Sequence, residues 1–360
     1  MATGKGKIDM NEEKTGQWQR RGFLGGALVA AGAAAGWVMT RLLPPPTPAS
    51  GNAAKLDDRF VYDISEFEET AANLLLFEPA GEFATGVDQA KRLVFWSGQG
   101  IVVSGEKSLA IISAEGARLK EWPLEAPTHC ILPLGKESIL VGYSDRYVIL
   151  DGSGREQFKS PNLGRRTYLT SVAVHEDRLF FADAGNREVL ICDRKSGDVL
   201  ERFGKKDADR GNPGFNIPSP YFAIGIPSDG RLRVANTGLL RVETYTLDGR
   251  FVSSWGEPGM KIDRFCGCCN PAYFTLTPAG DFITSEKGLA RINVYGADGK
   301  FKGAVAGPNG LVTDKELAKR ACTDCTVGAG FDVTLADNGD VLTLDPYRKI
   351  VRRFHPKTVS

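Results

Sequence analysis

The sequence predicts an all-β protein built as a six-bladed β-propeller. From about residue 58 onward, short stretches of strand-forming residues alternate with turns, and the 42 glycines and 19 prolines among 360 residues suit a chain with many turns. A unit of four strands then returns with a period of roughly 40–50 residues, which is typical of propeller blades. The content of 42% hydrophobic and 25% charged residues indicates a globular protein with a large core.

The N-terminal 50 residues predict an export signal rather than a part of the fold. The segment Gln19–Leu24 places an arginine pair directly before Phe-Leu. An uncharged run follows over residues 22–40, in which 11 of 19 residues are Gly or Ala, and Pro44–Pro46 come soon after it. This pattern resembles the twin-arginine export signal of bacteria. The resemblance implies a signal or membrane anchor with a Pro-rich linker over residues 1–50, and a propeller over residues 51–360.

Nineteen uncharged residues can just span a bilayer, so an uncleaved membrane anchor and a cleaved signal both stay open. Either of them predicts that the propeller works in the bacterial periplasm or at the outer face of the cytoplasmic membrane. Its partner is then expected to be another exported or membrane protein.

The charge distribution argues against a nucleic-acid partner. The formal net charge is +1, but residues 1–50 carry six basic and three acidic side chains. Residues 51–360 therefore hold 39 basic and 41 acidic groups, a net charge of −2. Nucleic-acid affinity depends on neutralising phosphates, and this body has no surplus of positive charge to do so.

The elements of the propeller can be assigned in order. A strand is expected over Arg59–Asp63, and Ser65–Glu68 offers a capping box for a short helix. Six repeats of the strand pattern follow, at about residues 92–122, 128–160, 170–203, 220–255, 272–305 and 331–354. The last repeat ends after three strands. Arg59–Asp63 is expected to supply its missing outer strand, which pairs the two ends of the chain and leaves no open edge.

Two of the repeats align closely. The segments Pro220–Val242 and Pro271–Ile292 each run from a proline and aromatic residues, through a small polar residue, to an arginine and a β-branched residue. The same motif surrounds Arg187 and Arg348. It resembles the NHL repeat, and the resemblance covers about residues 165–356. It implies a six-bladed propeller that binds a protein or glycan partner on its face, with the repeated arginines as scaffold.

Five of the seven cysteines fall in two short segments: Cys266, Cys268 and Cys269, then Cys322 and Cys325. The first segment directly precedes the inner strand of the fifth predicted blade, and the second precedes that of the sixth. Links between blades lie on the face around the mouth of the central channel, so the two groups are expected to be neighbours. Thr313–Arg320 predicts a short helix that could cap them.

Several chemistries fit five neighbouring cysteines. Four or more thiolates suit zinc, an iron–sulfur cluster or Cu(I). In an oxidising compartment the same residues could instead form two disulfides that staple the fifth blade to the sixth and leave one thiol over. A dithiol redox site is a third alternative. The spacing matches no standard zinc or ferredoxin pattern, so the identity of the cofactor stays unknown.

Other candidate residues carry a weaker signal. His129 precedes the inner strand of the second blade and could face the same mouth from across the ring. Matching positions between the second and third strands of four blades hold acidic or amide side chains: Asp183, Asn236, Glu286 and Asp345. They could bind a ligand around the channel, although such residues commonly satisfy backbone groups in turns. Cys130 and Cys192 are expected to be small core residues.

The sequence contains no linear enzyme signature, because Gly-x-Ser-x-Gly, phosphate-loop and dinucleotide motifs are absent. A channel-site hydrolase or lyase, with calcium held by carboxylates from separate blades, would leave no linear motif and stays open. Two hypotheses lead. The first is an exported propeller whose cysteines bind a metal or iron–sulfur cluster for a redox or electron-transfer assembly. The second is a disulfide-stapled binding scaffold with no catalytic activity.

Overall fold

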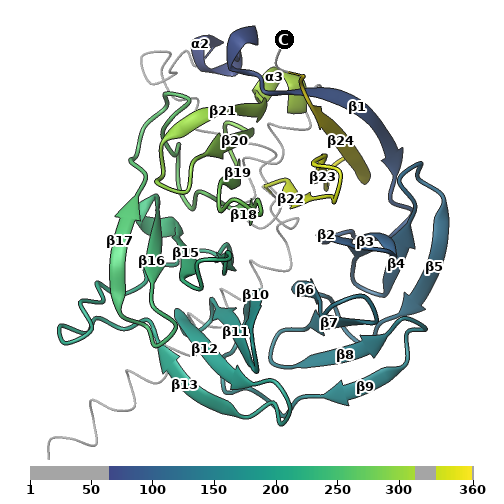
Figure 1. Ribbon diagram of the computed structural model, residues 1–360, viewed down its shortest axis with the longest axis vertical. Helices are drawn as coiled ribbons and strands as arrows, with labels where there is room; N and C mark the ends of the chain where they lie inside the picture. Colours follow the sequence, from purple (N-terminus) through teal and green to yellow (C-terminus); the bar gives the residue numbers. More distant parts are fainter. Residues whose placement is uncertain (1–64, 313–329, 359–360) are drawn as a thin grey trace, which may run out of the picture. The chain divides into compact units, whose positions relative to one another are not determined.

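Six four-stranded antiparallel sheets are arranged in a ring (Figure 1), which confirms the predicted six-bladed propeller. The computed structural model describes residues 65–312 and 330–358, all within one unit of the chain. The expectations for the export segment, for Arg59–Asp63 and for Thr313–Arg320 lie outside these residues, as do Cys322 and Cys325.

In blades 1 to 5, each sheet is made of four strands that follow one another in the sequence, and each strand pairs with the next. Their bounds agree closely with the predicted repeats. The strands are β2 (Arg92–Trp96), β3 (Gly100–Ser104), β4 (Ser108–Ile112) and β5 (Arg118–Pro123); β6 (Cys130–Pro133), β7 (Ser138–Gly142), β8 (Tyr147–Asp151) and β9 (Glu156–Lys159); β10 (Leu169–His175), β11 (Arg178–Asp183), β12 (Glu188–Asp193) and β13 (Val199–Phe203); β14 (Ile224–Gly225), β15 (Leu232–Asn236), β16 (Arg241–Tyr245) and β17 (Phe251–Trp255); β18 (Tyr273–Leu276), β19 (Phe282–Glu286), β20 (Arg291–Tyr295) and β21 (Phe301–Ala306).

Blade 6 joins the two ends of the described chain. It contains β22 (Asp332–Leu335), β23 (Val341–Asp345) and β24 (Ile350–Pro356), and its outer strand is β1 (Phe77–Ala84), antiparallel to β24. An N-terminal strand therefore closes the ring as expected. The strand that does so is β1, so the assignment of Arg59–Asp63 to this place was wrong.

Short helical segments lie near the closure, while a further 3₁₀ turn, η3 (Thr237–Leu239), joins β15 to β16 in blade 4. The capping-box segment forms α2 (Ser65–Glu68), and the 3₁₀ turn η2 (Ala72–Leu74) leads into β1. On the link from blade 5 to blade 6, α3 (Pro308–Leu311) begins with a proline at its first position, where the missing N–H costs nothing.

The inner strands close a ring around the channel. β2 contacts β6, and the contacts continue through β10, β14, β18 and β22 back to β2. Each inner strand thus begins close to the axis, and the residues just before it lie together at one end of the channel. This arrangement decides which side chains meet at the mouth.

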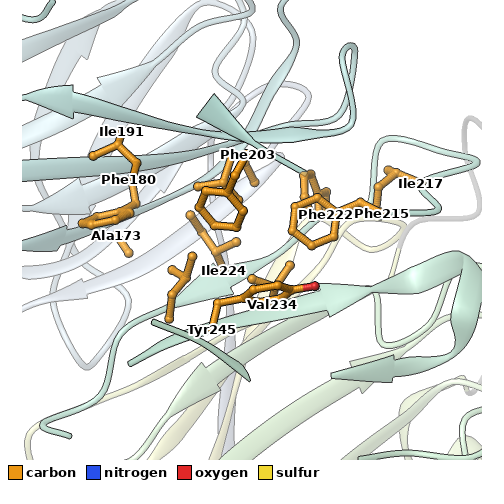
Figure 2. Packing of buried hydrophobic residues seen from close by; sticks show 13 residues of the cluster. Ala173, Phe180, Ile191, Phe203, Phe215, Ile217, Phe222, Ile224, Val234 and Tyr245 are labelled. Carbon is orange, nitrogen blue, oxygen red and sulfur yellow. The ribbon is translucent and has the colours of Figure 1, made fainter. Parts of the chain in front are cut away.

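The hydrophobic core lies between neighbouring blades rather than inside any one of them. Figure 2 shows the layer between blades 3 and 4, where Phe180 and Ile191 of blade 3 lie across from Ile224 and Val234 of blade 4. Tyr245 stands 5.6 Å from Phe203 between ring centroids. Five further clusters fill the other interfaces. Because each sheet is covered on both faces, its middle strands are almost wholly buried.

Candidate binding cavity and cysteine loop

A cavity of about 340 Å³ opens at the end of the channel where the inner strands begin. Every blade contributes to its wall. The contributions come from the residues just before or at the start of the inner strands, for example Arg92 in blade 1, His129 in blade 2 and Tyr273 in blade 5. Blade 6 adds Asp332 and the turn between β23 and β24.

Aromatic rings make up much of this wall: His129, Tyr168, Tyr221, Tyr273 and Tyr347. His129 and Tyr168 meet edge to face with centroids 4.5 Å apart, and Tyr221 and Tyr273 do so at 5.6 Å. Such contacts fix the rings against one another, so the shape of the cavity is set before any ligand enters.

The charged wall residues are unbalanced: Lys91, Arg92 and Lys349 are cationic, and Asp332 is the acidic residue among the lining side chains. Arg92 Nε lies 3.6 Å from Asp332 Oδ2, and the guanidinium covers the ring of Tyr273 at 4.8 Å from its centroid. Asp332 also accepts hydrogen bonds from the backbone N–H groups of Leu93 at 2.8 Å and Val333 at 3.1 Å. Burial raises the pKa of Asp332, while Arg92 and these N–H groups oppose the rise.

His129 is held in its neutral form at physiological pH. Burial, together with the nearby charges of Lys91 and Arg92, lowers the pKa of His129 to about 4. Its Nε2 lies 3.2 Å from the hydroxyl oxygen of Ser144. The structure therefore places His129 at the mouth, as a polar but uncharged part of the wall.

The cysteine loop, Cys266–Cys269, lies beside this cavity and is fastened to blade 5. The backbone N–H of Cys266 donates to Glu286 Oε2 at 3.0 Å. Asn270, fully buried, donates to the carbonyls of Cys266 and Lys287 and accepts from the N–H of Lys287 at 2.9 Å. Cys269 packs in a small cluster with Tyr221 and Ala272. The loop and the cavity thus share a wall.

The three thiols of this loop differ in exposure. Cys268 is exposed, Cys266 is partly buried and Cys269 is buried. Burial raises the pKa of both Cys266 and Cys269, which disfavours their thiolate forms.

The structure brings no complete metal site together within residues 65–312 and 330–358. There, no group of three or more His, Cys, Asp or Glu side chains is placed to hold an ion. The five cysteines in these ranges are free thiols, with no disulfide between any two of them: Cys130, Cys192, Cys266, Cys268 and Cys269. The pairing of the loop with Cys322 and Cys325 stays a prediction, because both lie outside these ranges.

The four repeated polar residues, Asp183, Asn236, Glu286 and Asp345, end the second strand of their blades and are buried within them. In each case the side chain bonds the backbone of the preceding link or the following turn. Asp183, for example, accepts from the N–H groups of Tyr168 at 2.9 Å and Asn186 at 3.2 Å. They do not line the cavity. Their contacts match the common role of such residues in turns.

Two further expectations concern residues away from the mouth. Cys130 and Cys192 lie in the apolar layer between blades 2 and 3, as small core residues. Arg291 belongs to the repeated arginines, and its side chain donates to three backbone carbonyls of the preceding link. That contact fits the scaffold role assigned to it.

Sequence reasoning missed most of the cavity wall. Arg92 and Asp332 are isolated charges at the first positions of inner strands, and the tyrosines resemble ordinary core residues. A usable signal was present in the repeat alignment, since Pro220-Tyr221 and Pro271-Ala-Tyr273 place a tyrosine after a proline at the start of two blades. Pro346-Tyr347 repeats the pair in the turn of blade 6.

The fold and this cavity define the chain as a six-bladed β-propeller with an axial cavity. No protein-family model matches the sequence, and no curated protein matches it. The NHL assignment therefore stays a resemblance. In the described part of the chain, no helix is both long and apolar enough to cross a membrane.

Solved structures share the architecture. The WD40 domain of Neurospora crassa Pan2 is 9% identical, over 79% of this chain and 96% of that one, with a TM-score of 0.52. A Bacteroides thetaiotaomicron protein of unknown function is 14% identical over 78% and 72%, with a TM-score of 0.50. A virginiamycin B lyase from Staphylococcus aureus is 12% identical over 74% and 80%, with a TM-score of 0.47. At these identities the likeness to the first two structures shows the fold alone.

Proposed function

We propose that the chain is an exported binding protein that holds a small ligand or a segment of a partner in the axial cavity beside its cysteine loop. The observation that carries this proposal is the cavity itself. It is enclosed by aromatic and charged side chains from all six blades, and their mutual contacts preform its shape. Propellers commonly bind on this kind of face, and no catalytic motif argues for a reaction there.

The test is to look for the ligand in protein purified from its native source. Folded protein is desalted and denatured, and the released small molecules are identified by mass spectrometry. A compound in stoichiometric amount supports the proposal. Tyr168→Ala, which removes one wall of the cavity, should lose that compound, and Leu200→Ala on the exposed outer strand β13 should keep it. Equal retention by both variants would place the compound elsewhere and refute the proposal.

Export is part of the proposal and depends on the arginine pair. Replacing Arg20 and Arg21 by lysine should leave the protein in the cytoplasm, with its signal uncleaved if cleavage normally occurs. Cell fractionation measures this directly. Normal recovery of the doubly substituted protein outside the cytoplasm would remove the twin-arginine assignment.

A second candidate function is the cysteine-held metal or iron–sulfur cluster. One observation favours it: Gly330 lies against Ala272, where an added Cβ would approach the Ala272 Cβ to 2.8 Å. Gly330 follows Cys325 by five residues in the sequence, and Ala272 follows Cys269 by three. Thiolates from both segments would then supply the ligands.

Metal and acid-labile sulfide analysis of protein purified without oxygen tests this candidate. Stoichiometric iron with sulfide, or zinc or copper, supports it, provided that Cys266→Ser and Cys322→Ser each remove the metal while Cys192→Ala retains it. A metal-free protein whose loop thiols are found in disulfides would instead support a stapled binding scaffold.

A further inference from the structure

We infer that the axial cavity binds a small planar organic anion of the aromatic carboxylate class, with the Arg92 guanidinium as the group that pairs with the carboxylate. The inference rests on the proposed binding function and deepens it. The charge of the wall, the placement of Arg92 and the occupation of the tyrosine faces each point to this ligand.

The wall presents a surplus of positive charge. Three cationic side chains line the cavity against one carboxylate. Lys91 and Lys349 are paired with Glu106 at 3.2 Å and Asp88 at 3.4 Å. Neither acid lines the cavity, and exposed pairs of this kind hold their partners weakly. Burial, together with the charges of Lys91 and Arg92, also lowers the pKa of His129 in the same wall. An anion entering the cavity is therefore attracted and a cation is repelled.

Arg92 is placed to meet that anion. It begins β2, its side chain is 14% exposed, and it is the least exposed of the three cationic side chains that line the cavity. Asp332 is held by two backbone N–H groups and stands 3.6 Å from Arg92 Nε, beyond ordinary hydrogen-bond length. Asp332 thus positions the guanidinium without an ordinary hydrogen bond to Nε, and Tyr273 is a further side chain that hydrogen-bonds to it, which does not exhaust the N–H groups of the guanidinium. A guanidinium has five N–H groups in a planar fork that matches a carboxylate.

Tyrosine-lined cavities can also bind organic cations over the ring faces, so that class has to be weighed. Here two of the faces already have cations of the protein. Arg92 covers Tyr273 at 4.8 Å, and the Lys287 Nζ lies 4.9 Å from the centroid of Tyr221. A cationic ligand at either of these two faces would compete with the protein's own cation and with the positive charge of the wall. The ring edges of the wall tyrosines and of His129 can contact the face of a flat aromatic acid.

The size of the cavity agrees with a compact ligand. At about 340 Å³ it lies at the lower end of the range for small-molecule sites, which is roughly 300–1,000 Å³. One aromatic ring with a carboxylate and a polar substituent fits such a volume. The polar substituent would meet tyrosine hydroxyls and the neutral His129.

Calorimetry with a matched series of probes tests the inference. The probes are 4-hydroxybenzoate, its neutral amide 4-hydroxybenzamide, and 4-hydroxyphenyltrimethylammonium as the cation. The acid should bind, the amide should bind at least about tenfold more weakly because it lacks the charge-assisted bonds, and the cation should not bind. Equal binding of the acid and the amide, or no binding of the acid up to about 10 mM, overturns the inference.

Variants identify the anchoring group. The double variant Arg92→Gln with Asp332→Asn removes both charges at once, so no buried charge is left alone, and it should lose acid binding by about tenfold or more. Arg155→Gln replaces an exposed arginine that does not line the cavity; it is the control and should bind the acid normally. Normal acid binding by the double variant would refute the role of Arg92.

The two failures can be told apart. If the amide binds as well as the acid at the cavity, the charge argument fails while the binding function stands. If no probe binds and no compound is released from the purified protein, the proposed function fails as well.

Discussion

The buried pair of Glu286 and Arg291 gives the sharpest stability prediction. Glu286 is fully buried and Arg291 nearly so, and Glu286 Oε2 lies 2.8 Å from an Arg291 terminal nitrogen. The same oxygen accepts the N–H of Cys266, and Oε1 accepts from Asn293 at 3.2 Å. The pair therefore joins β19, β20 and the cysteine loop.

Removing one charge leaves the other uncompensated in the interior, which typically costs about 3–5 kcal/mol. Glu286→Gln should lower the free energy of unfolding by about 3 kcal/mol, at the lower end of this range. The loss is smaller here because Arg291 keeps its hydrogen bonds to the carbonyls of Met260, Lys261 and Arg264. Arg291→Met should lie nearer 5 kcal/mol, because it strands the carboxylate and leaves those carbonyls without their donor. The double variant should cost less than the sum of the two.

Urea unfolding of the reduced protein measures these free energies. Hydrogen exchange at the cysteine loop gives a second, independent measurement. The backbone amide of Cys266 should exchange faster in Glu286→Gln, because its hydrogen-bond acceptor has lost its charge. Glu82→Gln is the matched control, since Glu82 pairs with Arg348 at the exposed closure and should cost less than about 1 kcal/mol. A loss below about 1 kcal/mol in Glu286→Gln, or additive effects in the double variant, would refute the reasoning.

Three further predictions follow from other parts of the structure. The folded pKa of His129 is about 4 and the unfolded value is about 6.5, so between these pH values the unfolded chain binds a proton that the folded chain does not. The stabilisation from neutral His129 is therefore complete above pH 6.5, and the free energy of unfolding should fall by about 1–3 kcal/mol toward pH 4. His129→Gln should reduce this dependence on pH, as measured by urea unfolding at pH 7 and pH 5. In native reduced protein, alkylation followed by peptide mass spectrometry should find Cys268 labelled before Cys130 and Cys192. Burial raises the pKa of Cys130 and of Cys192 to about 12, so these two thiols should react only after unfolding. Prompt labelling of either would show that the layer between blades 2 and 3 opens readily. A chain that starts at Ser65 should unfold cooperatively. A chain that also lacks β1 should expose the edge of β24 and aggregate, as measured by light scattering. A monomeric protein without β1 that still unfolds cooperatively would contradict the role of β1 in closing the ring.

The blades were predictable because each repeat combines alternating strand residues with turn residues at nearly constant spacing. The closing strand was not. β1 contains Pro79 and Gly81, its pairing shifts register between them, and its side chains are largely exposed. Such a strand has no alternation to detect, and its residues are tolerated because it lies at the edge of a sheet. Arg59–Asp63 has the more strand-like sequence, which is why the pattern alone predicts it in this place.

The cavity could be predicted only in part. The position of His129 before an inner strand was enough to place it at the mouth, because the topology of a propeller gathers these positions. Tyr168, Tyr221 and Tyr273 come from three blades and stand about fifty residues apart, so no local pattern connects them. Glu286 illustrates the opposite case, in which the sequence suggests a ligand site that the contacts do not support. Its position matches those of Asp183, Asn236 and Asp345 in the repeats, but its carboxylate oxygens bond the backbone of the preceding link and Arg291.

Blade 6 pairs β1, near the start of the described residues, with β24, near their end, and this pairing determines when the ring can close during synthesis. Glu82 and Arg348, which meet at the seam, are 266 residues apart in the sequence. A ribosome makes that much chain in tens of seconds, during which β1 has no strand to join. Five blades can form as they emerge, but the ring stays open until β24 leaves the exit tunnel. The nascent chain therefore carries an unpaired edge from the time β1 emerges until β24 does, and this interval is when a chaperone would have most to protect.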